Sequence, residues 1–211
     1  MTTKKIENNK IAVAVSGNGR SLENLIRQQN CWNYQVAAVI ASSPGCKALK
    51  IAKNYQIDTF IGEFNEKTLP TLKAPLYQWL DNLEINLIAL AGFLRKFPMH
   101  SDWDMRILNI HPGLLPKYGG IGMYGDRVHK AVLAAGDRQS GASVHFVTSK
   151  YDEGPVIAQS YVKIHQDDDY ASLSARVFSV ECLLYPQVIS ELLDGSLPLA
   201  NHQIRTFQHD N

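Results

Sequence analysis

The segment NIHPGLLPKYGG, residues 109–120, places an amide and an imidazole two residues apart at the end of an apolar run. Asn109 and His111 follow the letters MRIL, which are typical of a buried strand, and a proline comes directly after the histidine. Side chains at positions i and i+2 of a strand point to the same face, so both groups can act on one atom. An amide N–H and an imidazolium N–H are suited to stabilise a carbonyl oxygen that gains negative charge.

Asp152, in the letters YDEG, is a candidate partner for this histidine. A carboxylate that accepts a hydrogen bond from an imidazole holds the ring in one orientation and favours its protonated form. The two residues are 41 positions apart, so their spacing does not establish the pair. Taken alone, a histidine such as His111 is more often a structural residue of the core.

A glycine-bearing loop, SGNGRS, lies between an expected strand and an expected helix. Glycines let backbone N–H groups approach an anion closely, and a helix N-terminus adds favourable partial charge. The loop is not a dinucleotide fingerprint, because the third glycine of GxGxxG would fall on Leu22. A phosphate site and a plain tight turn are both compatible with this spacing. The candidate phosphate contacts are Gly17, Asn18, Gly19, Arg20 and Ser21.

A second glycine, Gly92, follows the apolar run IALA and precedes Phe93 and Arg95. Glycine at the end of a strand permits close approach of the backbone to a ligand. A tight exit turn is the alternative reading.

The elements that would position these groups alternate between strands and helices. Buried strands are expected at residues 10–16, 36–43, 57–62, 85–93 and 105–111, and an antiparallel pair at 142–148 and 155–164. Helices are expected at 22–29 with Ser21 as N-cap, at 46–55, from near Pro75 to 83, at 126–136 ending at Gly136, and at 170–193.

This alternation predicts an α/β fold with a doubly wound, mostly parallel, Rossmann-like sheet and antiparallel strands towards the C-terminus. The 211 residues are expected to form one domain over 1–211, because α/β domains often reach this size undivided. In open sheets of this kind, ligands bind beyond the carboxyl ends of the strands where the strand order reverses. The polar clusters described above all fall at such ends.

Composition narrows the classes of function. The formal net charge of +1 gives no reason to expect nucleic acid or a membrane surface as partner. Three widely spaced cysteines and seven scattered histidines suggest neither a disulfide framework nor a metal site. The polar start, MTTKKIENNK, does not resemble a signal peptide, and no apolar run has membrane-spanning length, so a cytoplasmic protein is expected.

Five stretches resemble, in order and spacing, the glycinamide ribonucleotide formyltransferase family. They are SGNG, LAGFLRKF, NIHPGLLPKY, GASVHFVTSKYDEGPVIAQ and SVECLLYP. The resemblance extends from about Lys10 to Leu197 and is most specific over residues 109–159. It implies transfer of a formyl group from the co-substrate N10-formyltetrahydrofolate to the amine of glycinamide ribonucleotide in purine biosynthesis, without a metal. A monomer or a homodimer is compatible with it.

The family's catalytic trio falls on Asn109, His111 and Asp152. The resemblance implies that the first two stabilise the oxyanion and that the aspartate raises the pKa of the histidine and assists proton movement. The phosphate loop falls on residues 17–21, but Arg20 and Ser21 replace the usual serine and asparagine. The resemblance also implies that Gly92 belongs to the binding site of the ribonucleotide substrate.

The remaining binding residues are also implied by the resemblance. Lys67 aligns loosely with an arginine that reaches the phosphate, and Glu181 matches the glutamate that binds the ribose. The folate pocket would be lined by Phe93, Leu94, Arg95, Phe97, Leu108 and Val147, with His145 beside it. For His145, a structural histidine of a strand is the alternative. The segment GGIGMYGDRVH, 119–129, is longer than in many relatives.

Four other functions are compatible with parts of this pattern. A formyltetrahydrofolate hydrolase has the same trio, but its family carries an extra N-terminal domain, and only about ten residues precede the first expected strand. Methionyl-tRNA formyltransferase adds a C-terminal barrel and a basic surface. A sugar-nucleotide N-formyltransferase uses the same Asn, His and Asp, but the glycine loop and Glu181 favour a ribonucleotide. A non-catalytic folate- or nucleotide-binding module is the rival from another class.

Overall fold

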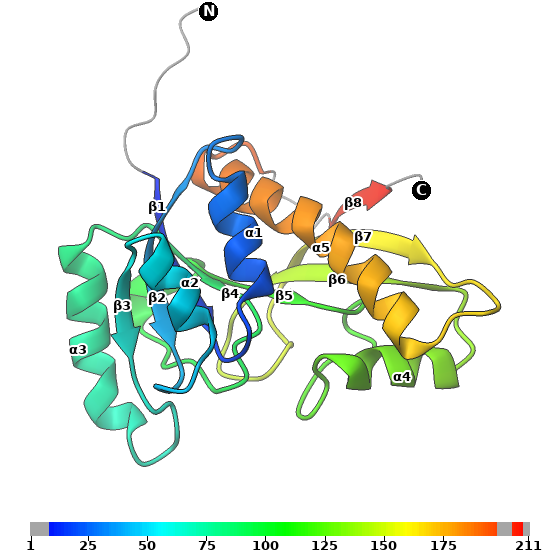
Figure 1. Ribbon diagram of the computed structural model, residues 1–211, viewed down its shortest axis with the longest axis horizontal. Coiled ribbons are helices and arrows are strands. Elements are labelled where there is room, and N and C mark those ends of the chain that lie inside the picture. Colours follow the sequence, from blue (N-terminus) through cyan, green and yellow to red (C-terminus); the bar gives the residue numbers. More distant parts are fainter. Residues whose placement is uncertain (1–8, 198–203, 209–211) are drawn as a thin grey trace, which may run out of the picture. The chain divides into compact units, whose positions relative to one another are not determined.

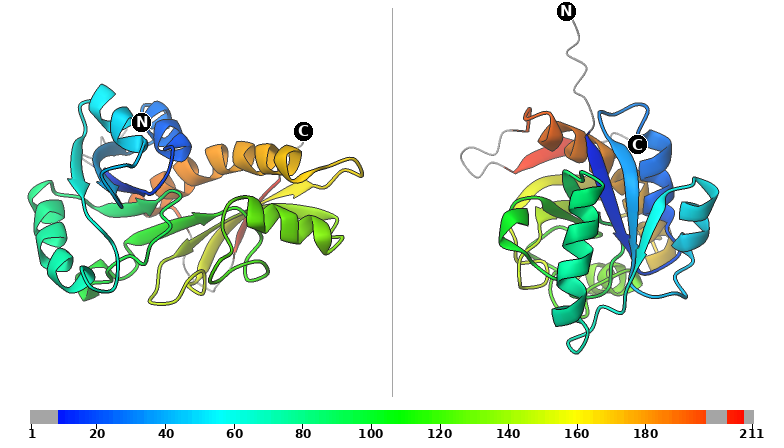
Figure 2. Two further views of the ribbon diagram at one scale, coloured as in Figure 1. Left: turned by 60° about the horizontal axis from the view of Figure 1, so that its bottom comes forward. Right: turned by 90° about the vertical axis from the view of Figure 1, so that its left-hand side faces the viewer.

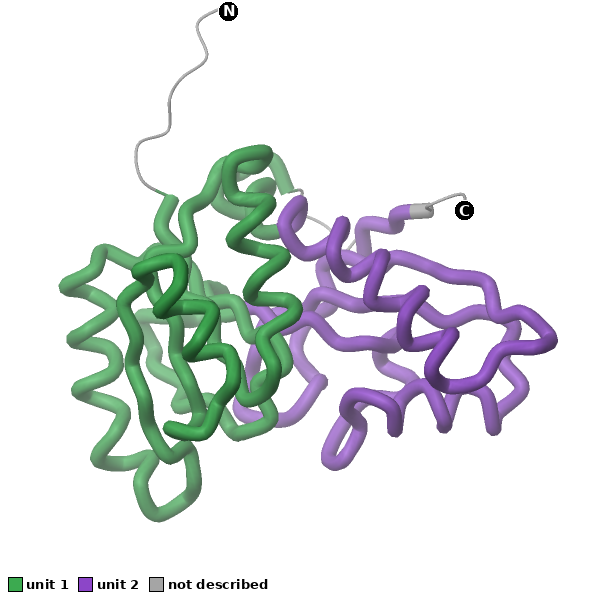
Figure 3. Tube along the Cα trace, in the orientation of Figure 1, with its two compact units in different colours: residues 1–107, 189–197 green, residues 108–188, 198–211 purple. Residues whose placement is uncertain are grey.

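The structure is a computed structural model that describes residues 9–197 and 204–208. The chain divides into two compact units, one of residues 1–107 and 189–197 and one of residues 108–188 and 198–211 (Figure 3). The expectation of a single domain therefore stays a prediction.

The first unit is built on four parallel strands. They are β1 (Lys10–Val15), β2 (Gln35–Ala41), β3 (Asp58–Ile61) and β4 (Leu87–Leu90), in the order β3-β2-β1-β4. The right-hand view of Figure 2 shows β1, β2 and β3 side by side, from dark blue to cyan. Every residue of β4, and every residue of β1 after Lys10, is buried, as expected of strands covered on both faces. The order runs from β1 in one direction to β2 and in the other to β4. The carboxyl ends of β1 and β4 therefore flank the point where the strand order reverses.

Three α-helices and a short 3₁₀ helix complete this unit. They are α1 (Arg20–Gln28), α2 (Ala48–Asn54), α3 (Leu69–Asn82) and η1 (Ser101–Trp103). Helices α1 and α2 pack on each other and on β2 (Figure 1). Helix α1 buries Leu22, Leu25 and Ile26, whose spacing forms one apolar stripe.

Two sequence-based boundaries in this unit are wrong. Helix α3 begins at Leu69 and not near Pro75, which lies inside the helix. Pro70 occupies the first turn, where its missing N–H is not needed, and the lost hydrogen bond at Pro75 is offset by burial of Leu76, Tyr77 and Leu80.

Helix α1 begins at Arg20, so Ser21 is not its N-cap. Gly19 takes that position with φ 82° and makes no side-chain cap hydrogen bond. A Cβ atom on Gly19 would lie 2.7 Å from the Cβ of Ala48, the first residue of α2. Glycine is therefore required here both for the left-handed backbone and for the close approach of the two helices.

The second unit carries the antiparallel strands. They are β5 (Ile107–His111), β6 (Gln139–Phe146) and β7 (Val156–Lys163), with β8 (Arg205–Gln208) parallel to β7. Its helices are α4 (Asp126–Ala134) and α5 (Tyr170–Leu193). The predicted antiparallel pair, the helix ending before Gly136 and the bounds of the last helix are confirmed. Strand β8 was not predicted, because a run of four residues is too short to show a period.

The turn between β6 and β7 contains a very close backbone approach. A Cβ atom on Gly154 would lie 1.7 Å from the carbonyl oxygen of Phe146. The Phe146 N–H donates to the carbonyl of Pro155, so the two strands meet tightly at this point. Only glycine fits there.

Taken together, these strands confirm the predicted α/β class, with parallel strands first and antiparallel strands later in the chain. Among the helices of the described residues, none combines the length and the apolar character that a membrane crossing requires.

Candidate active site

One face of the second unit's strands gathers polar side chains. Asn109 pairs directly with His145 across β5 and β6, and His111 pairs with Ser143. Directly opposite residues of neighbouring strands share a face, so all four side chains lie on the same side. Gln159 of β7 joins them, because it pairs with Ser143. The prediction that Asn109 and His111 share a face is confirmed.

Asp152 brings its carboxylate to this face from the loop between β6 and β7. Its Oδ2 lies 3.6 Å from Nδ1 of His111, and its Oδ1 lies 3.5 Å from Nε2 of His145. The Gly120 N–H donates to Oδ2 at 3.0 Å. Both histidine side chains are 3% exposed and the aspartate is 12% exposed, so the cluster is largely shielded from water. The pairing of His111 with Asp152, which spacing could not establish, is present.

The amide of Asn109 lies between the carboxylate and the second histidine. Its Nδ2 is 3.0 Å from Nε2 of His145 and 3.5 Å from Oδ1 of Asp152. The other ring nitrogen of His145, Nδ1, is 2.8 Å from the carbonyl of Phe146, which can only accept. The proton therefore lies on Nδ1, and Nε2 accepts from the Asn109 amide. His145 thus fixes the orientation of that amide.

The second nitrogen of His111 also meets an acceptor. Its Nε2 lies 2.9 Å from the backbone carbonyl of Tyr118. Tyr118 has φ 61°, an uncommon value for a residue other than glycine. Since a carbonyl cannot donate, Nε2 carries a proton, and Nδ1 faces the Asp152 carboxylate. Both ring nitrogens therefore face oxygen acceptors.

Burial and neighbouring charge act in opposite directions on His111. Burial lowers the pKa of the ring, whereas the Asp152 carboxylate and the Tyr118 carbonyl raise it, and His145 lowers it further. The net pKa is below the ordinary value. The Asp152 carboxylate raises the pKa of His111, as predicted. The expectation that the pKa of the ring is raised overall is wrong, because the loss of hydration on burial lowers the pKa by more than the carboxylate raises it.

For Asp152 the balance favours the charged form. Burial would raise the pKa of the carboxyl group, but the neighbouring rings of His145 and His111 and the Gly120 N–H together lower it below its ordinary value. The group is therefore a carboxylate at neutral pH, and it can receive a proton only when a strong acid forms beside it.

The two glycine clusters of the first unit lie next to each other. The Ser16 N–H donates to the carbonyl of Gly92 at 3.1 Å, and the Ser16 hydroxyl accepts from the Leu94 N–H at 2.9 Å. These bonds join the ends of β1 and β4, where the strand order reverses. The first turn of α1 exposes backbone N–H groups that have no intrahelical partner, as any helix start does.

The loop that precedes α1 rests on the start of α2. The carbonyl of Gly17 accepts from the Ala48 N–H at 3.2 Å and from the Cys46 thiol at 3.3 Å. Arg20 is exposed at the first position of α1. The loop therefore has a fixed backbone and is followed by an exposed cationic residue.

The other predicted binding residues differ in exposure. Phe93 and Phe97 are buried, and their rings pack on Phe64 at centroid distances of 5.0 and 6.2 Å. Leu108 is fully buried, and its carbonyl accepts from the hydroxyl of Tyr185. Three of the predicted folate contacts thus belong to the core.

The more accessible candidates fall on loops and on one helix. Leu94 is half exposed, and Arg95 and Lys67 are exposed. Val147 is half-buried directly after β6. Glu181 is half-buried on α5, and its charge helps to raise the pKa of the buried Tyr185 after burial itself.

Sequence reasoning missed the residues that surround the trio. They are Tyr118, Gly120, Ser143, Gln159 and a buried histidine of α4, His129. A signal was present in β6, where Gly, Ser and His alternate with Ala, Val and Phe, as expected of a strand with one polar face. The Tyr118 carbonyl and the Gly120 N–H are backbone groups, so residue type gives no signal for them.

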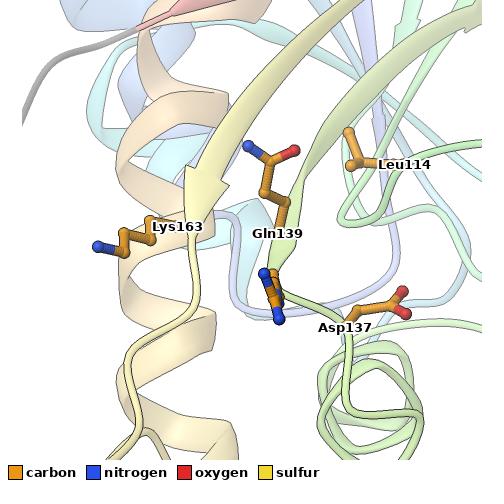
Figure 4. A pocket seen from close by; sticks show the side chains of 5 residues that line it. Leu114, Asp137, Gln139 and Lys163 are labelled. Carbon is orange, nitrogen blue, oxygen red and sulfur yellow. The ribbon is translucent and has the colours of Figure 1, made fainter.

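An open cavity of about 630 Å³ lies elsewhere on the second unit. It is lined by Leu114, Asp137, Arg138, Gln139 and Lys163 (Figure 4). Lys163 and Asp137 point in opposite directions in this view, and no residue of the predicted site lines the cavity. Within residues 9–197 and 204–208, no three His, Cys, Asp or Glu side chains form a group that could hold a metal ion.

Comparisons with known proteins identify the family of this chain. Residues 9–189 match the family described as formyl transferase. The chain is 35% identical to phosphoribosylglycinamide formyltransferase of Escherichia coli, over 90% of this chain and 89% of that protein. It is 33% identical to a chloroplastic phosphoribosylglycinamide formyltransferase of Vigna unguiculata, over 90% of this chain, and spans 62% of that relative's length.

A solved structure also shares the fold. The crystal structure of phosphoribosylglycinamide formyltransferase from Anaplasma phagocytophilum is similar with a TM-score of 0.83 and 25% identity. The match covers 97% of this chain and all of that chain.

Proposed function

We propose, from the premise that this chain belongs to the formyl transferase family, that it transfers a formyl group from N10-formyltetrahydrofolate to the amine of glycinamide ribonucleotide. The observation that carries the proposal is the polar face on which Asn109, His111 and Asp152 meet. Relatives named as phosphoribosylglycinamide formyltransferases support the choice of acceptor. The product would serve purine biosynthesis.

In this reaction the substrate amine attacks the formyl carbon. A new C–N bond forms, the carbonyl oxygen becomes an oxyanion, and the bond from the carbon to N10 of the folate then breaks. Two N–H donors of the site, Nδ2 of Asn109 and Nε2 of His111, are engaged by protein acceptors. The developing oxyanion would replace these acceptors, because a full negative charge accepts a hydrogen bond more strongly than a carbonyl or a neutral imidazole.

The amine must also lose a proton, and N10 must gain one. In the neutral His111 ring, Nδ1 has a lone pair beside the Asp152 carboxylate, so the two together form a proton acceptor. The oxyanion raises the pKa of the ring as it forms, since a nearby negative charge favours the cation. The proton taken from the amine would thus reach His111 and Asp152, through water, and return to N10 as the intermediate collapses.

The first unit would supply the phosphate site. Backbone N–H groups at Gly17–Ser21 lie in a glycine loop that leads into a helix N-terminus, an arrangement that favours anions. The Arg20 guanidinium would add a charged contact, with Lys67 as a further candidate. Gly92 would lie close to the substrate, and Glu181 would bind the ribose hydroxyl groups. The folate contacts would be Leu94, Arg95, Val147 and the backbone near Asp152, with Phe93, Phe97 and Leu108 supporting them from the core.

One assay distinguishes the proposed activity from three alternatives. A sugar-nucleotide N-formyltransferase would use another amine, a deformylase would use water, and a binding module would turn nothing over. The purified chain is mixed with N10-formyltetrahydrofolate and either glycinamide ribonucleotide, a 4-amino sugar nucleotide or no acceptor, and deformylated folate is measured. We expect turnover with the ribonucleotide only. Equal turnover without an acceptor would show a hydrolase, and none in any mixture would contradict catalysis.

A further inference from the structure

A closed set of hydrogen bonds underlies the segment that follows His111. The hydroxyl of Ser143 donates to the carbonyl of Gly113 at 2.7 Å and accepts from the Leu115 N–H at 3.0 Å. It also accepts from Nε2 of Gln159 at 2.9 Å. A hydroxyl group has one hydrogen and two lone pairs, so Ser143 is fully used.

The side chain of Gln159 is used just as fully. Its Nε2 donates one hydrogen to Ser143 and the other to the carbonyl of Leu115, also at 2.9 Å. Its Oε1 accepts from the hydroxyl of Tyr161 at 3.1 Å, which fixes the direction of the amide. Ser143 is fully buried and Gln159 is 5% exposed. A buried network with every donor and acceptor paired has one arrangement, and breaking one bond leaves an unpaired group.

The segment held in this way leads to the Tyr118 carbonyl. Residues 113 and 115 are fixed by Ser143 and Gln159, and three residues further on the Tyr118 carbonyl lies 2.9 Å from Nε2 of His111. At the far end of the segment, the Tyr118 hydroxyl donates to Asp137 at 2.7 Å. Gln159 itself does not bond to His111. The bonds described above connect it to the ring through the backbone of this segment.

We propose that Gln159 is a positioning residue for the transfer reaction, which fixes residues 113–118 so that the Tyr118 carbonyl keeps the proton of neutral His111 on Nε2. This inference rests on the proposed function, because it assigns Nε2 the task of donating to the oxyanion. Without that carbonyl, the proton of the neutral ring moves to Nδ1, where the Asp152 carboxylate accepts it. The N–H that the proposed mechanism assigns to the oxyanion is then lost, although the fold is intact.

The test replaces Gln159 with methionine, which has a similar volume and no donor. Protein labelled with ¹⁵N-histidine is examined by NMR, and the His111 signals are assigned by their disappearance in His111→Asn. We expect the neutral ring to carry its proton on Nε2 in the parent and on Nδ1 in a large fraction of Gln159→Met. We expect kcat to fall roughly a hundredfold, the effect of a displacement of about 1 Å in an active site, with KM for the ribonucleotide nearly unchanged.

Ser160→Ala is the matched control. Ser160 is the next residue of β7, is fully buried, and its hydroxyl has no hydrogen-bond partner among the described residues. Its loss should leave kcat within about twofold and the His111 tautomer unchanged. If Gln159→Met does not fold, Tyr161→Phe replaces it, because that change removes only the bond that directs the amide. For this variant we expect a smaller change in the His111 tautomer and a smaller fall in kcat.

The outcome separates this inference from the proposed function. If His111→Asn keeps its turnover, the proposed mechanism fails, whereas the tautomer still shows whether Gln159 positions the ring. A folded Gln159→Met or Tyr161→Phe with the parent's His111 tautomer and a kcat within about twofold overturns the inference.

Discussion

In the proposed reaction, the polar face of the second unit and the glycine loops of the first unit would both bind negative charge, but with different parts of the chain. On the polar face the donors are side chains, they are buried, and each is already engaged by a neighbour. In the loops the donors are backbone N–H groups at the start of α1, and the loop itself is exposed.

This difference suits the charges that the two regions would meet. An oxyanion exists only during the reaction, so donors held ready in a place shielded from water act where the charge appears. A phosphate is charged before and after the reaction and must enter from water, and backbone donors at the surface suffice for it. Substitutions should therefore lower turnover in the first region and weaken binding in the second.

The largest effect is expected for Asp152→Asn. The amide keeps the shape of the carboxylate but removes the proton acceptor beside Nδ1 of His111 and lowers the pKa of that ring further. We expect kcat to fall about 10²- to 10⁴-fold, the range of general acid–base catalysis, with folate binding retained. Glu153→Gln is the matched control, since this neighbouring carboxylate is exposed and pairs with Lys150. A kcat within a few-fold of the parent in steady-state assays would remove Asp152 from the mechanism.

The next largest effect is expected for Arg20→Ala, and it should fall on binding. A charge-assisted hydrogen bond contributes about 1.5–3 kcal/mol, so KM for the ribonucleotide should rise roughly ten- to a hundredfold while KM for the folate stays constant. Arg27→Ala is the control on the same helix, where the side chain pairs with Glu23. A change of less than about twofold in the ribonucleotide constant would mean that backbone donors and Lys67 hold the phosphate.

Gly19→Ala should weaken both stability and phosphate binding. The new methyl group meets Ala48 and Ile51, and the residue must keep a positive φ. We expect the free energy of unfolding to fall by about 1–3 kcal/mol in urea titrations, and KM for the ribonucleotide to rise. Gly45→Ala is the control, because a Cβ atom there meets nothing within 4 Å. Equal stability of the two variants would contradict the close approach of α1 and α2.

The smallest effect is expected for His129→Leu, and it is a change in pH dependence. Burial lowers the pKa of His129 from its ordinary 6.5, although Asp126 raises it, so the folded state prefers the neutral ring. Stability from this group is complete above pH 6.5 and is lost as pH falls through the lowered pKa. The variant should lose less stability on acidification, by at most about 1.4 kcal/mol per pH unit. Urea titrations at pH 8 and below pH 6.5 measure the free energy of unfolding of both proteins. An equal loss of stability on acidification in the two proteins would contradict the prediction.

The sequence predicted the strands best where burial leaves a continuous apolar run, as in β1. It also placed Asn109 and His111 on one face, because the period of a strand is fixed by geometry. The start of α3 was misplaced because two prolines suggested an interruption that side-chain burial overcomes. Ser21 was misassigned because a glycine N-cap depends on a backbone angle that residue type does not reveal.

For the candidate site, residue type and resemblance predicted the trio, but not the carbonyl of Tyr118 or the N–H of Gly120. Backbone groups are present in every residue, so no letter marks the ones that bind. The net pKa of His111 depends on how deeply the ring is buried, which becomes known only when the surrounding elements are in place.

The tight contact of Gly154 with the Phe146 carbonyl also has a consequence for how this gene can vary. In a library in which each codon is randomised in turn and clones are selected for formyl transfer, position 154 should accept no other amino acid. Gly45, where a methyl group meets only open space, should accept many. The backbone geometry of the short turn that carries Asp152 would then fix the amino acid at position 154, whatever the selection on the turn's other residues.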